Sequence, residues 1–158
     1  MTVTIRLEGS EQLQRELRRL SDDLREEAGK AVLATAVEMR ADIVTSIQRG
    51  PASGRTYTHY FYTNKNGKLV QGRKRAKPHT ASAPEQPPMS DTGRLANSIT
   101  FDRVGDLTAT VGSALNYAPW LEYGTSRMAA RPFFRPAVER MRPKFIGRLE
   151  GIIKRAAR

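Results

Sequence analysis

The chain has 158 residues, of which 39% are hydrophobic and 27% are charged, and this length and composition fit one domain spanning residues 1–158 with a core of its own. It has no cysteine, which excludes a disulfide framework and thiolate metal sites, and we expect neither a secretory signal nor a membrane span because no apolar run approaches about 18 residues. The formal net charge is +11; residues 49–92 contribute 8 minus 2, or +6, and residues 127–158 contribute 10 minus 2, or +8, which indicates an anionic partner.

The first predicted elements are a strand and a long helix. Residues 2–8 alternate apolar and polar side chains, as a half-buried strand does. Apolar residues then recur at helical spacing, which predicts one long helix, or two in close succession, from about residue 10 to residue 48. Gly29 is expected to weaken this helix locally, and Gly50-Pro51 ends it. The second half of the apolar stripe consists of Ala28, Val32, Ala36, Met39, Ile43 and Ile47.

Residues 49–92 are predicted to form a basic arm outside the core. Asn66-Gly67 follows a strand-like stretch and predicts a β-hairpin. Residues 72–88 are basic and rich in proline, alanine and serine, a composition that does not build a core. We therefore expect a mobile arm or a segment that is ordered by a partner.

A short helical turn at 94–98 and a second β-hairpin are predicted next. A two-residue turn would place Phe101 opposite Thr110 and split the apolar faces of the two strands. A three-residue loop over 104–106 pairs Phe101 with Ala109 and keeps the apolar faces together. We expect the longer loop, with Gly105 adopting the unusual backbone angles.

Two more helices complete the expected fold. Pro119 suits the first turn of a short helix and Gly124 its end. A helical apolar stripe then runs from Phe134 to Ile152. The predicted fold class is α+β, with a small antiparallel sheet packed against a long N-terminal helix and a C-terminal helix, and with an extended basic arm.

No set of residues indicates an active site, so we expect no enzymatic activity, no cofactor and no metal. The only histidines, His59 and His79, lie in the arm, and no glycine-rich phosphate loop follows a strand. Glu122 is the one acid within an aromatic stretch, and we expect it to pair with Arg127 or Arg131.

The basic arm is a candidate for binding nucleic acid or another partner. Its cationic run can neutralise several phosphates, although no helix-turn-helix, zinc or RNA-recognition signature accompanies it. A small nucleic-acid-binding protein that uses residues 65–77 is therefore an alternative function. The residues proposed to contact DNA or a partner are Arg73, Lys74, Arg75 and Lys77.

The stretch YAPWLEYGTSRMAARPFFRP, residues 117–136, holds five aromatic residues and no lysine. One interpretation places these aromatic side chains in the core, at the end of the sheet. The other turns some of them outward against an identical subunit, because protein interfaces favour aromatic residues and arginine over lysine. Both interpretations can hold for different residues.

Three sequence runs resemble a family of tail components of long-tailed bacteriophages. They are HTASAPEQPPMSDTGRLANSI at 79–99, VGSALNYAPWLEYGT at 111–125 and MAARPFFRPA at 128–137. One departure is Glu85-Gln86, where the family usually has a glycine. The resemblance marks as family-motif or subunit-interface positions Gly93, Leu95, Ser98, Tyr117, Trp120, Glu122, Gly124, Thr125, Arg131, Pro132, Phe133 and Pro136.

The resemblance implies a structural virion protein of the neck or tail-completion region, which joins head and tail and is made in the host cytoplasm. Such proteins act as homo-oligomeric rings, expected to be hexamers, between a neck or connector protein and the tail tube or terminator protein. Double-stranded DNA passes through the lumen. Because head-to-tail contacts join different faces, we expect the basic C-terminal end to meet the acidic N-terminal helix of the next copy.

Overall fold

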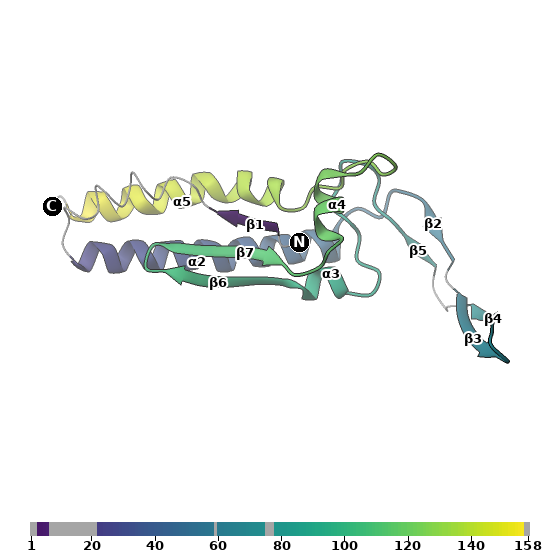
Figure 1. The fold of residues 1–158 in the computed structure, drawn as a ribbon. Helices are drawn as coiled ribbons and strands as arrows, with labels where there is room; N and C mark the ends of the chain where they lie inside the picture. The colour runs from purple at the N-terminus through teal and green to yellow at the C-terminus, as the bar shows by residue number, and fades with distance from the viewer. Residues whose placement is uncertain (1–2, 7–21, 59, 75–77, 157–158) are drawn as a thin grey trace.

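The computed structural model describes residues 3–6, 22–58, 60–74 and 78–156. Two long helices, α2 (Asp22–Arg49) and α5 (Arg135–Ala156), lie side by side and form the length of the body (Figure 1). A small antiparallel sheet packs against α2. The predicted α+β fold is confirmed. Of the predicted first helix, residues 10–21 lie outside the described residues. No helix of the described part is both long enough and apolar enough to cross a membrane.

The sheet of the body has three antiparallel strands, and the central one comes last in the sequence. Its members are β1 (Val3–Arg6), β6 (Ile99–Gly105) and β7 (Thr108–Ser113), in the order β1-β7-β6. Ser113 is the register partner of Val3 on one side and of Ile99 on the other. The N-terminal strand expected at 2–8 is thus present and pairs with a strand more than a hundred residues away.

The turn between β6 and β7 corrects the sequence prediction. Phe101 lies opposite Val111, not Ala109, and the last register pair is Gly105 with Thr108. The three-residue loop is therefore wrong: residues 106 and 107 alone connect the last pair, and the register shifts earlier, between Arg103 and Gly105. Gly105 does not adopt a positive φ. The error displaces the register by two residues, so the same side chains still face the core.

The core lies between α2, the sheet and α5. Every residue of the apolar stripe predicted for the second half of the first helix is buried, with Ile43 and Ile47 fully inaccessible. Gly29 is buried as well, and a Cβ atom there would lie 2.6 Å from the backbone oxygen of Asp106. The glycine therefore lets the β6–β7 turn approach the helix, a packing role that helix propensity does not reveal.

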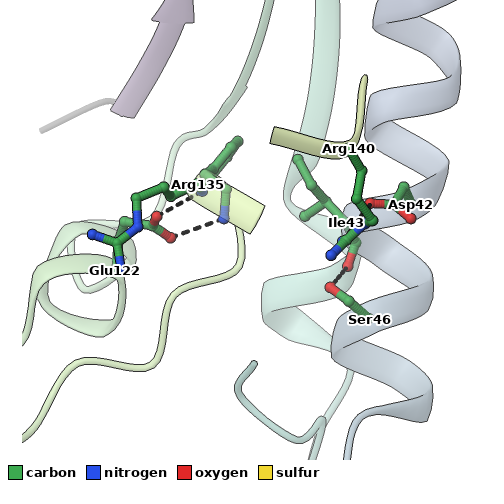
Figure 2. A network of polar contacts seen from close by, with 7 residues as sticks. Asp42, Ile43, Ser46, Glu122, Arg135 and Arg140 are labelled. Atoms are coloured by element: carbon green, nitrogen blue, oxygen red, sulfur yellow. Dashed lines mark hydrogen bonds and ion pairs between the residues drawn. The ribbon is translucent and has the colours of Figure 1, made fainter. Parts of the chain in front are cut away.

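Ion pairs join α2 to α5 along the body. Both Nε and Nη2 of Arg140 donate to Oδ2 of Asp42, at 3.1 and 2.6 Å (Figure 2). Arg148 pairs with Glu38 and donates to the buried hydroxyl of Thr35 at 2.8 Å. A third pair, between Arg155 and Glu27, spans 2.9 Å.

These ion pairs use part of the opposite charge of the two helical regions within one chain. The sequence led us to expect that the basic C-terminal end meets the acidic helix of a neighbouring copy. In the structure, the acids at 27, 38 and 42 are each paired with an arginine of α5 in the same chain. These three pairs join the two helices, and the contact expected between neighbouring copies stays a prediction.

The predicted arm contains two short strand ladders. β2 (Thr56–Tyr57) pairs with β5 (His79–Thr80), and β3 (Tyr60–Lys65) pairs with β4 (Lys68–Lys74). The hairpin predicted at Asn66-Gly67 is confirmed, since both residues have positive φ, 51° and 77°. Figure 1 shows both ladders beyond the end of the two helices.

The end of the arm that leads back to α3 (Arg94–Asn97) packs on the body. Ala81 and Ser82 are buried, although they belong to the stretch whose composition was judged unable to form a core. Hydrogen bonds fix this part: Ala81 N–H donates to the carbonyl of Arg55 at 3.0 Å, and Ser90 N–H donates to that of Ile47 at 2.9 Å. Small side chains fit here because backbone segments approach one another closely.

Candidate subunit interface at the α4 corner

The α4 corner, residues 117–136, is built around the short helix α4 (Ala118–Tyr123). Pro119 lies in its first turn, where a missing N–H group costs nothing. Gly124 ends the helix with φ 75°, and a Cβ atom there would lie 2.8 Å from the carbonyl oxygen of Met128. The predicted start and end of this helix are confirmed, and only glycine fits its end.

Glu122 joins α4 to the start of α5. Its side chain is 5% exposed, and its carboxylate accepts three backbone hydrogen bonds. The N–H groups of Phe133 and Phe134 donate to Oε2 at 2.8 and 2.9 Å, and that of Arg135 donates to Oε1 at 2.8 Å. Figure 2 shows the carboxylate pointing at the first turn of α5. These N–H groups have no partner inside the helix, so Glu122 caps it.

The capping role corrects the expectation that Glu122 forms an ion pair. Among the described residues, its carboxylate makes no ion pair with Arg127 or Arg131. A buried carboxylate is stable here because three N–H groups replace its water and because the N-terminal end of a helix carries partial positive charge.

The aromatic residues of the corner divide between the core and the surface, so both interpretations of the sequence hold for different residues. Phe133 and Phe134 are 0% and 1% exposed, with ring centroids 4.8 Å apart. Tyr117 is partly buried against the same core. Trp120 and Tyr123 are 57% and 75% exposed. Three residues apart on one helix, these two are neighbours on its outer face.

The loop after α4 is held by its own backbone. Thr125 N–H donates to the carbonyl of Met128 at 2.8 Å, and the Thr125 hydroxyl accepts from Arg127 N–H at 3.2 Å. Arg131 N–H returns to α4 and donates to the carbonyl of Leu121 at 2.6 Å. Pro132 is buried, and Pro136 lies in the first turn of α5, where no N–H group is required. The surface that carries Trp120 and Tyr123 therefore stands on a fixed support.

Three further motif residues lie around α3 and connect it to the α4 corner. Gly93 precedes the helix with φ 78°, and Leu95 is buried in the core. The Ser98 hydroxyl donates to the carbonyl of Leu95 at 2.7 Å and lies 2.8 Å from the hydroxyl of Ser113. Ser113 in turn accepts from the N–H of Leu115 at 3.2 Å, on the segment that enters α4. These residues position the corner but do not belong to its outer face.

The base of the arm also contacts the corner. Glu85 N–H donates to the carbonyl of Ala130 at 2.9 Å. Glu85 has φ 61°, a backbone conformation that residues other than glycine rarely adopt. The resemblance seen in the sequence implies a glycine at this turn, where this chain has Glu85. The departure thus falls on a backbone that favours glycine.

The proposed DNA or partner contacts divide between described and undescribed parts of the chain. Arg73 and Lys74 belong to β4, whereas Arg75 and Lys77 lie outside the described residues. The strand β4, which holds Arg73 and Lys74, lies beyond the body and away from α4 (Figure 1).

Sequence reasoning named most corner residues but missed what Glu122 does. A helix cap is normally sought within three or four residues of the helix start, and Glu122 lies thirteen residues before Arg135. The prolines at 132 and 136 were the available sequence signal for this role. They mark a helix start that has no capping side chain nearby in the sequence, so the cap has to come from elsewhere. The outward position of Tyr123 had no sequence signal at all.

Comparison with models of known protein families gives a match over most of the chain. The model of a family described as "Bacteriophage HK97-gp10, putative tail-component" matches residues 11–124, which includes α2, the arm, the β6–β7 hairpin and α4. No curated protein matches the chain, and no solved structure matches it.

Proposed function

The chain belongs to the HK97-gp10-like family of bacteriophage tail components, and from this premise we propose that it is a structural protein of the virion neck or tail-completion region. It forms a homo-oligomeric ring, a hexamer, at the head-proximal end of the tail. It contacts a neck or connector protein on one side and the tail tube or terminator protein on the other. It carries out no chemical reaction, and double-stranded DNA passes through the ring.

The observation that supports a contact between subunits is the exposed pair Trp120 and Tyr123 on a rigid helix. Exposed tryptophan and tyrosine dominate the binding energy of many interfaces. A surface that is already rigid before binding also loses little conformational entropy on association. Glu122, Gly124 and Arg131 provide that rigidity through their hydrogen bonds and backbone angles. We propose that the α4 corner is the contact by which one copy recognises the next component of the ring.

The contact is tested by replacing both exposed aromatic residues with serine, as W120S/Y123S. Each of two such anchors contributes about 2 kcal/mol or more, so the dissociation constant of the ring contact should rise on the order of a thousandfold. The matched control is Val104→Ser, which removes an apolar side chain that is 66% exposed on β6. Native mass spectrometry of the purified proteins and incorporation into phage tails provide the measurements.

The proposal predicts that the wild-type chain and the Val104→Ser variant assemble, whereas the double variant remains monomeric and is absent from tails. Equal assembly of all three proteins would remove the α4 corner from the interface. Electron microscopy of the intact particle tests the wider proposal. Density for this fold anywhere other than in a ring at the head-proximal end of the tail would contradict it.

A further inference from the structure

Most of the arm carries positive charge only. Residues 50–84 contain seven lysine and arginine residues and no aspartate or glutamate. On α2 and α5, by contrast, acids pair with arginines across the helices. A segment that carries only positive charge attracts a polyanion.

The hairpin β3–β4 concentrates part of this charge at its tip. Lys65 and Lys68 are register partners on either side of the Asn66-Gly67 turn. The turn residues and Lys68 are exposed. The hairpin lies beyond the end of the two helices (Figure 1). A two-stranded ribbon of this kind fits the major groove of B-form DNA.

The kind of cationic residue separates the arm from the α4 corner. Four of the seven cations of residues 50–84 are lysines, and lysine is depleted in protein interfaces. The corner, residues 117–136, has arginines and aromatic residues but no lysine. The two surfaces therefore suit different partners. Lysine serves well as a flexible point charge for phosphate, while the corner has the composition of a protein contact.

We propose that the β3–β4 hairpin binds the phosphate backbone of double-stranded DNA, with the lysine pair at its tip as the leading contact and without sequence specificity. The proposal rests on the proposed function for the presence of DNA beside the protein. Within the basic segment 65–77 considered from the sequence, it names the hairpin tip, Lys65 and Lys68, as the leading contact.

The test compares a tip variant with a variant of the body that has the same net charge. K65Q/K68Q removes the tip lysines, and K144Q/K154Q removes two exposed lysines of α5. Binding of the full-length protein to a fluorescent random-sequence 30-base-pair duplex is measured by anisotropy over a series of salt concentrations. Circular dichroism and thermal unfolding establish that both variants are folded.

The proposal predicts a smaller salt dependence for the tip variant only. Each lost phosphate contact reduces the slope of log K against log salt by about 0.9, so the slope should fall by about 1.8 in K65Q/K68Q. The affinity in about 0.1 M salt should fall between roughly tenfold and fiftyfold. K144Q/K154Q should bind as the wild type does.

Two results would overturn the proposal. Equal losses in the two variants would mean that the overall charge, not the hairpin, attracts DNA. Binding of poly-glutamate as tight as binding of the duplex, with the same dependence on the tip lysines, would indicate an acidic protein as the partner. Native mass spectrometry reports on assembly independently of DNA binding. A wild-type protein that assembles but does not bind the duplex would contradict the hairpin proposal alone. A wild-type protein that binds the duplex but does not assemble would contradict the proposed ring contact alone.

Discussion

The hydrogen bonds of Glu122 allow a quantitative prediction for the variant Glu122→Gln. A glutamine side chain keeps one carbonyl oxygen, which still accepts from the N–H groups of Phe133 and Phe134. Its NH2 group replaces Oε1 and faces the N–H of Arg135, so two donors meet. An unsatisfied buried donor costs about 1–3 kcal/mol, and loss of a negative charge at a helix N-terminus costs up to about 2 kcal/mol in a buried setting.

We therefore expect Glu122→Gln to lower the free energy of unfolding by about 3 kcal/mol. For a chain of this size, that loss corresponds to a decrease in Tm of about 6–12 °C. Differential scanning calorimetry measures the change, and chemical denaturation provides an independent value.

The matched control is Glu139→Gln, which makes the same chemical change at an exposed position of α5. Surface substitutions of this kind usually change stability by no more than about 0.5 kcal/mol. If both variants lowered Tm equally, or if Glu122→Gln changed Tm by less than about 2 °C, then Glu122 would not be the cap that stabilises α5.

Substitutions at Gly29, Gly147 and Glu85 test a close backbone approach and a positive φ. Gly29→Ala should lower the free energy of unfolding by about 1 kcal/mol despite the better helix propensity of alanine, because its Cβ would meet the Asp106 carbonyl oxygen at 2.6 Å. Gly147→Ala on α5, where a Cβ meets nothing within 4 Å, should instead raise the free energy of unfolding by up to about 1 kcal/mol. Urea titrations measure both changes. If both variants were stabilised, the β6–β7 turn would move aside for a Cβ at position 29 at little cost. Glu85→Gly should raise Tm by about 1–4 °C, because glycine relieves the positive φ while keeping the backbone N–H group, and an equal rise in Glu85→Ala would assign the effect to the lost charge instead.

The sequence alone was sufficient for the elements whose signals are local. A helical apolar stripe predicted most of the buried face of α2, since a helix has one fixed period, although it missed the buried Ala31 and Thr35. Pro119 and Gly124 marked the ends of α4, and Asn66-Gly67 marked the hairpin turn, because each residue type restricts its own backbone angles.

Some errors arose where several local solutions have nearly the same energy. The register between β6 and β7 was predicted two residues away from its true value, since both registers bury the same side chains and only packing distinguishes them. Gly29 was interpreted as a weak point of the helix, whereas its partner is a turn that lies more than seventy residues later in the sequence.

The sequence by itself determined the fold class, the periodic core and the segregation of charge into the arm and the C-terminal end. Only the tertiary structure decided how those charges and carboxylates are used. Asp42 pairs with an arginine ninety-eight residues away, and Glu122 caps a helix that begins thirteen residues later, because folding brings distant groups within hydrogen-bond distance. Tertiary packing likewise left Trp120 and Tyr123 at the surface while burying Phe133 and Phe134, since the core has room for only some of the aromatic side chains that share this stretch.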